Sequence, residues 1–132
     1  MKPQPGTGGG FWRARLTSFV FAWRGVREMV RAGGNVRLHF AATIAVIIAG
    51  FALKVTAGEW SALVLAIGLV WAAEGLNTAI EILADRVSRE RDVHIGRAKD
   101  TAAGAVLIAA IAAAIVGVLI LGPRVWALVS GS

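Results

Sequence analysis

The sequence has no cysteine, only two histidines and only eight acidic residues among its 132 residues. Without cysteine the chain forms no disulfide, no zinc–thiolate centre and no thiol nucleophile. Charged residues make up 17% of the chain, below the ~25% typical of soluble domains, whereas hydrophobic residues make up 57%. A soluble domain this small buries only about 60–70% of its chain surface. The composition therefore excludes a soluble enzyme and favours one small membrane domain.

Positive charge is plentiful by comparison, with fourteen Lys and Arg residues and a net charge of +6. Seven of these residues precede the first long apolar stretch, five lie between the second and the third, and Lys54 and Arg124 remain. With three spans, the positive-inside rule places the twelve on the cytoplasmic side, together with the N-terminus. We expect a multi-pass protein of the cell membrane. Because the charges flank apolar segments, we expect no nucleic-acid partner.

The chain divides into a tail over residues 1–10, rich in Gly and Pro, and a single membrane domain over residues 11–132. Over about residues 11–33, large apolar side chains recur at helical spacing beside arginines, which predicts an amphipathic helix in the lipid headgroup region. The alternative is a helix packed on a soluble core. The apolar positions of this helix are Trp12, Leu16, Phe19, Trp23, Val26 and Val30.

Three apolar stretches follow, which we expect to span the membrane over about residues 38–58, 60–85 and 100–122. In the first of these, Phe40–Gly58 has 19 residues and would be about 28 Å long as a helix. This length is close to the ~30 Å hydrocarbon core of a bilayer. The third stretch has no charge from Thr101 to Gly122 and is expected to end at Pro123. Its many small residues favour close helix packing, as in an oligomer. The predicted fold class is an all-α membrane protein.

Four polar residues recur in the second span at steps of three, four and four: Glu74, Asn77, Glu81 and Asp85. This spacing places them on one face of a helix, toward its cytoplasmic end. A charge at the centre of a span costs about 2.5–3.5 kcal/mol or more, so these residues are functional candidates. Three carboxylates on one stripe would repel each other unless one is protonated or a cation is bound. Oxygen ligands of this type suit Mg²⁺.

Lys99 and Asp100 stand directly before the third span, with Asp100 as its expected N-cap. The start of that helix and the Lys99 ammonium would together favour a phosphate group. Carboxylates for a metal, a lysine for phosphate and a membrane location favour phosphoryl transfer to a lipid alcohol. Two alternatives are open: a proton or ion pathway, and a structural role in Glu–Arg pairs. We expect His39 and His94 to be interfacial polar residues rather than ligands.

The segment Glu74–Arg86, EGLNTAIEILADR, followed by GRAKD over Gly96–Asp100, resembles the prokaryotic diacylglycerol kinase family. This family of small membrane lipid kinases includes the undecaprenol kinases. The resemblance covers about residues 15–122 and begins with FAWRG over Phe21–Gly25. The segment Asn35–His39, NVRLH, is similar to the undecaprenol kinase branch.

The resemblance implies a homotrimeric helical bundle, with one surface helix and three spans in each subunit. Its active sites would lie at the cytoplasmic membrane boundary, shared between subunits, and transfer phosphate from ATP with Mg²⁺ directly to a lipid hydroxyl. Glu74 would be the general base and Glu81 the metal ligand. The residues implied at the nucleotide are Asn77, Glu81, Glu90, Lys99 and Asp100, and those implied for lipid binding or support are Arg15, Trp23 and Asp85.

The sequence departs from the family pattern in two places. Arg91 and Asp92 replace its usual Tyr-His, and Gly33 stands where the family has a second metal-binding glutamate. Glu28 lies five residues earlier, about 140° around a helix, and is a poor substitute. We expect an active kinase with modified metal binding. The alternatives are a catalytically impaired homologue and a non-enzymatic membrane scaffold.

Overall fold

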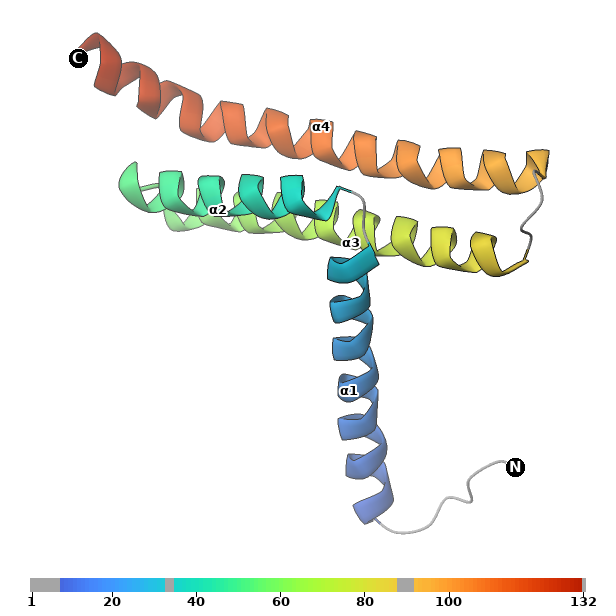
Figure 1. Ribbon diagram of the computed structural model, residues 1–132. Coiled ribbons are helices and arrows are strands. Elements are labelled where there is room, and N and C mark those ends of the chain that lie inside the picture. Colours follow the sequence, from blue (N-terminus) through green and yellow to red (C-terminus); the bar gives the residue numbers. More distant parts are fainter. Residues whose placement is uncertain (1–7, 33–34, 88–91, 132) are drawn as a thin grey trace.

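The computed structural model describes residues 8–32, 35–87 and 92–131, and these residues form four helices and no strand. The helices are α1 (Gly8–Ala32), α2 (Val36–Ala52), α3 (Ala57–Val87) and α4 (Val93–Ser130). Figure 1 shows α2, α3 and α4 running alongside one another, whereas α1 leaves this bundle at a steep angle. The prediction of an all-α protein is confirmed.

Packing between α3 and α4 forms the centre of the bundle. Buried positions of α3 recur at seven-residue steps, at Leu63, Val70, Asn77 and Ala84, so they lie along one face of the helix. The facing residues of α4 are small or branched: Ala102, Val106 and Ala109 are buried. Small side chains let two helix backbones approach closely. Glu74, Asn77 and Thr78 therefore lie on or beside the packed face of α3, at the level of this contact.

Helix α2 packs against the first half of α3 through two tryptophans. The ring of Trp60 lies over Gly50, where a Cβ atom would come within 2.6 Å of it. Further along, Trp71 donates a hydrogen bond from Nε1 to Thr43 Oγ1 at 3.0 Å. These contacts fix how far α2 is shifted along α3.

Among the described residues, α3 and α4 are each long and apolar enough to cross a membrane. A third crossing is present if α2 is counted together with α1, from which it is bent by 106°. Alone, the 17 residues of α2 extend about 26 Å. The protein is therefore an integral membrane protein with two or three apolar helices of spanning length.

Helix α1 is exposed along almost its whole length, including its aromatic side chains. The guanidinium groups of Arg15 and Arg24 lie over the rings of Phe11 and Phe21, at 4.9 and 5.6 Å from the ring centres. An exposed helix with aromatic rings and arginines suits the membrane surface. It begins at Gly8, earlier than expected, whereas residues 1–7 of the expected tail lie outside the described residues.

Helix α4 extends beyond the expected third span, residues 100–122, at both ends. Helix α4 begins at Val93, because the Asp92 carboxylate caps it by accepting from the backbone N–H groups of His94 and Ile95. Asp100 is therefore inside the helix and is not its N-cap. At the other end α4 continues through Pro123 to Ser130. Arg124 donates to the carbonyl oxygen of Ile120 at 3.2 Å, in the turn that the proline disturbs.

Candidate functional site

Glu74 is the most deeply buried ionisable group among the described residues, with 1% of its surface exposed. It lies on α3, where the helix faces α2 and α4. The next residue, Gly75, lies against Met29 of α1, whose sulfur would be 3.1 Å from a Cβ atom at that position. Glu74 therefore sits where the surface helix meets the bundle. A buried carboxylate is costly unless it is paired, hydrogen-bonded or used.

His39 of α2 faces this carboxylate. Its Nε2 atom lies 3.7 Å from Glu74 Oε2, and 11% of its side chain is exposed. The packing of α2 against α3 turns His39 inward, toward this carboxylate, which the sequence did not predict. His94, by contrast, is exposed in the first turn of α4.

Asn77 and Thr78 complete a buried polar cluster, defined here as His39, Glu74, Asn77 and Thr78. Four buried atoms in it have no hydrogen-bond partner among the described residues: His39 Nε2, Glu74 Oε2, Asn77 Oδ1 and Thr78 Oγ1. Most buried polar atoms in proteins are hydrogen-bonded, so a group of four without partners indicates a site for a ligand, water or another chain. The sequence pattern missed His39 and Thr78.

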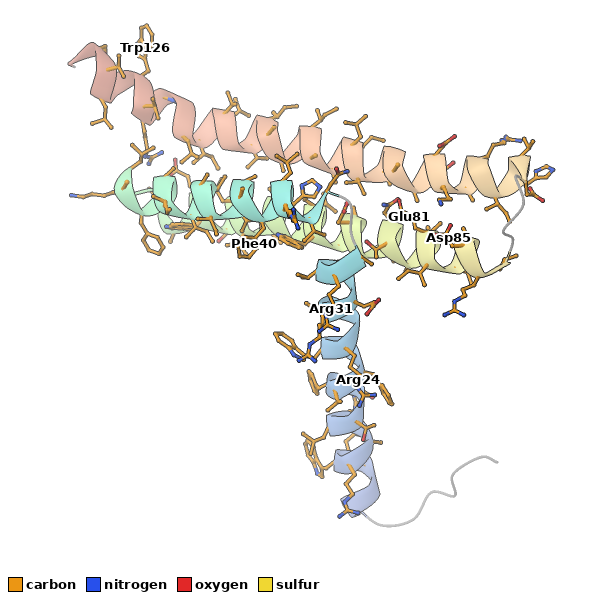
Figure 2. The ribbon with its side chains drawn as sticks, in the orientation of Figure 1. Arg24, Arg31, Phe40, Glu81, Asp85 and Trp126 are labelled. Carbon is orange, nitrogen blue, oxygen red and sulfur yellow. The ribbon has the colours of Figure 1, made fainter. Side chains whose placement is uncertain are left out.

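The acidic stripe of α3 becomes more exposed toward the α3–α4 turn. Asn77 donates from Nδ2 to Glu81 Oε1 at 3.1 Å, and Glu81 is half-buried. Asp85 is 72% exposed and accepts a hydrogen bond from Lys99 Nζ at 3.0 Å. Figure 2 shows Glu81 and Asp85 on the part of α3 that extends beyond α1. The polar face of α3 therefore extends from the buried carboxylate of Glu74 to the exposed ion pair of Asp85 with Lys99.

Of the other predicted site residues, those that the structure describes lie on α4 and on α1, outside the buried polar cluster. Asp100 is exposed on α4, one residue after Lys99. Arg15 and Trp23 are exposed on α1, which extends away from the bundle in Figure 1. Glu90 lies outside the described residues. Within the described part of one chain, the residues brought together are Glu74, Asn77 and Glu81, with Lys99 and Asp85 near the turn.

Carboxylates dominate the candidate metal ligands. Among the described residues, no three His, Asp or Glu side chains converge into a ready-made metal site. Mg²⁺, however, is usually held by one or two carboxylates together with substrate phosphates and water. The half-buried Glu81 carboxylate, oriented by Asn77, is a suitable oxygen ligand of this kind. The residues therefore fit a magnesium ion that arrives with a nucleotide.

An apolar groove of about 790 Å³ opens between α2, α3 and α4. It extends from His39 and Thr43 to Trp126 near the end of α4, and Ala113 and Gly117 form part of its wall. One end of the groove thus reaches the buried polar cluster through His39. Apart from Thr43 and Trp126, the rest of the groove is lined by aliphatic side chains and glycines, which suits the hydrocarbon chain of a ligand.

The fold and this cluster define a small α-helical membrane protein with a buried carboxylate site next to an apolar groove. The family model of prokaryotic diacylglycerol kinase matches residues 20–121. The chain is 41% identical to an undecaprenol kinase of Bacillus subtilis over 107 residues, 81% of this chain and 87% of that protein. It is 41% identical to a diacylglycerol kinase of Synechocystis over 114 residues, 86% of this chain and 65% of that protein.

A diacylglycerol kinase of Escherichia coli K12 is 34% identical over 101 residues, which are 76% of this chain and 83% of that protein. The family match covers most of the chain. The protein therefore belongs to the prokaryotic diacylglycerol kinase family, and it is a phosphotransferase of the lipid kinase class.

Proposed function

We propose that this protein transfers the γ-phosphate of ATP directly to the hydroxyl group of a membrane lipid alcohol, either diacylglycerol or undecaprenol. The observation that carries the proposal is the buried carboxylate of Glu74, whose Oε2 atom has no hydrogen-bond partner among the described residues. It faces His39, which lines one end of an apolar groove. The kinase names of the relatives support the same reaction class.

Glu74 is the general base in this proposal. It accepts the hydroxyl proton as the lipid oxygen forms its bond to the γ-phosphorus. The bond from that phosphorus to the β–γ bridging oxygen breaks, and ADP leaves. Burial of Glu74 excludes water, which would otherwise compete with the lipid hydroxyl. Positioning and charge neutralisation supply most of the rate in phosphoryl transfer.

Glu81 would hold Mg²⁺, with its carboxylate oriented by Asn77. When bound, the ion would supply charge neutralisation for the phosphate groups. Lys99 and Asp100, with Glu90, contact the nucleotide. Asp85 holds Lys99 on the side of α4 that faces α3.

The membrane arrangement follows the same proposal. The apolar groove accepts the hydrocarbon chain of the lipid, and its end at His39 brings the hydroxyl to Glu74. Arg15 and Trp23 support lipid binding from the exposed α1, at the cytoplasmic surface with the N-terminus. Three copies form a homotrimer in which a neighbouring subunit completes the site, supported by the four unpartnered atoms of the cluster.

The test is transfer of labelled phosphate from ATP to undecaprenol and to diacylglycerol, side by side, in detergent–lipid micelles. Transfer should be lost in Glu74→Gln. Glu59→Gln makes the same chemical change at the opposite end of the bundle and should keep its activity per folded molecule. No transfer to either lipid, from folded wild-type protein over a full Mg²⁺ titration, would overturn the proposal in favour of a catalytically impaired homologue.

A further inference from the structure

We propose that His39 is a positioning residue, which donates a hydrogen bond from Nε2 to the Glu74 carboxylate and orients it toward the lipid hydroxyl. This inference rests on the proposed function, in which Glu74 is the base. It adds a residue of α2 to the carboxylate and nucleotide residues of α3 and α4.

The geometry of the two side chains carries the inference. Nε2 of His39 and Oε2 of Glu74 are 3.7 Å apart, both are buried, and neither has a hydrogen-bond partner among the described residues. The pair thus presents one nitrogen and one oxygen that match as donor and acceptor. Hydrogen bonds in catalytic sites are often long without substrate and shorten when it binds. A small movement of either side chain would bring the two atoms into hydrogen-bonding distance.

Two hydrogen bonds hold His39 in place. Its carbonyl oxygen accepts from Thr43 Oγ1 at 2.7 Å, and Thr43 Oγ1 in turn accepts from Trp71 Nε1 of α3 at 3.0 Å. Trp71 precedes Glu74 by three residues, about one turn of helix. The hydrogen bond between Thr43 and Trp71 therefore holds α2 against α3 about one helical turn before Glu74. This connection fixes the distance between the two groups.

The position of His39 at the end of the groove places its interaction with Glu74 where the lipid hydroxyl is expected to lie. His39 lines the polar end of the apolar groove and also faces Glu74. A hydroxyl at the end of a hydrocarbon chain in the groove would meet the imidazole and the carboxylate together. One carboxylate oxygen held by His39 leaves the other free to accept the hydroxyl proton. His39 acts through Glu74 and takes no proton from the substrate itself.

Three substitutions of His39 distinguish a role in positioning the Glu74 carboxylate from a role in packing alone. The amide nitrogen of glutamine can occupy the place of histidine Nε2, whereas that of asparagine reaches only the place of Nδ1. Phenylalanine keeps the ring volume and removes both nitrogens. The variants His39→Gln, His39→Asn and His39→Phe are compared in full-length protein, by kcat, by KM for ATP and by the midpoint of thermal unfolding.

We expect His39→Asn and His39→Phe to lower kcat by roughly 10–100-fold, with KM for ATP unchanged, because a misplaced catalytic group costs rate rather than nucleotide binding. His39→Gln should recover most of that loss.

Equal kcat in all three variants and the wild type would overturn the inference. So would a kcat in folded His39→Gln as low as in His39→Phe, since packing alone would then explain the effect. Failure of the proposed function is recognised separately: Glu74→Gln would keep wild-type activity, whatever the His39 variants do. Glutamine and asparagine differ only in reach, so this comparison stays informative even where His39→Phe does not fold.

Discussion

The guanidinium group of Arg124 donates two hydrogen bonds to the Glu59 carboxylate, to Oε1 at 2.6 Å and to Oε2 at 2.7 Å. Glu59 also accepts from the backbone N–H and the hydroxyl group of Thr56, which caps the start of α3. Arg124 is the residue after Pro123. The ion pair therefore joins the start of α3 to the turn of α4 that the proline disturbs. Figure 1 shows the start of α3 and the last part of α4 at the same end of the bundle.

This ion pair should stabilise the protein without taking part in the reaction. Arg124→Lys keeps the charge but loses the paired geometry, so we expect the midpoint of thermal unfolding in detergent to fall by a few degrees. Phosphate transfer per folded molecule should stay within about twofold of the wild type. Thermal unfolding followed by circular dichroism, with the transfer assay at a temperature below the transition, measures both. A large loss of activity in fully folded protein would place Arg124 in the catalytic machinery instead.

Gly50 should tolerate no side chain, because a Cβ atom there would lie 2.6 Å from the Trp60 ring and 2.7 Å from a second ring atom. Gly50→Ala should destabilise the protein by about 1–3 kcal/mol, as overpacking of a well-packed contact does. Gly58→Ala is the matched control in α3: nothing lies within 4 Å of a Cβ atom at that position, and alanine is the better helix former. Equal unfolding midpoints for the two variants would show that α2 does not pack on Trp60 in this way.

Gly75 is the contact point between the surface helix and the site. A valine there would push against Met29, whose sulfur lies 3.1 Å from the position of the Cβ atom, and would move α1 away from Glu74. We expect Gly75→Val to lower phosphate transfer by roughly 10–100-fold, because displacements of about 1 Å at a site have effects of this size. The spin-label distance between α1 and α3 should lengthen, and the absence of native cysteine makes such labelling selective.

Gly68→Val is the control for that experiment. It places the same β-branched residue on the same helix, where nothing lies within 4 Å of a Cβ atom. Its label distance and its activity should match those of the wild type. A Gly75→Val variant with wild-type activity and an unchanged distance would contradict the proposed role of the α1 contact.

Sequence spacing correctly predicted which candidate site residues share one face of a helix, but it did not predict the contact between two helices at Glu74. The steps between Glu74, Asn77 and Glu81 place them along α3 wherever that helix lies. The approach of His39 to Glu74 joins residues on different helices, and the packing of Thr43 and Trp71 decides it. In the sequence, His39 is only a polar residue before an apolar run, which also describes an interfacial histidine.

Helix α4 is longer than the sequence predicts, for local reasons. Asp92 is a good N-cap residue eight positions before Asp100, but the charges around it made the loop look longer than it is. Pro123 suggested a stop, yet the apolar run VWALV that follows it is long enough to continue the helix. Only the structure shows that Arg124 bonds both to Glu59 and to the carbonyl of Ile120 across that turn.

The Mg²⁺ concentration needed for half-maximal rate should depend on position 33, which lies outside the described residues and where glycine replaces the glutamate that the resemblance implies. The proposed metal ligand is Glu81, oriented by Asn77, and glycine stands where the resemblance implies a second metal-binding glutamate. With one carboxylate fewer, the site should hold Mg²⁺ less tightly, so half-maximal rate should require an unusually high Mg²⁺ concentration. Gly33→Glu should lower that concentration about tenfold or more, if one added carboxylate contributes about 1.4 kcal/mol or more of binding.

Two further variants test this interpretation. Glu81→Gln should raise the Mg²⁺ concentration needed for half-maximal rate, and Gly34→Glu, one position away on the backbone, serves as the control. A Mg²⁺ requirement that Gly33→Glu leaves unchanged while Glu81→Gln raises it would mean that the second carboxylate comes from elsewhere in the assembly.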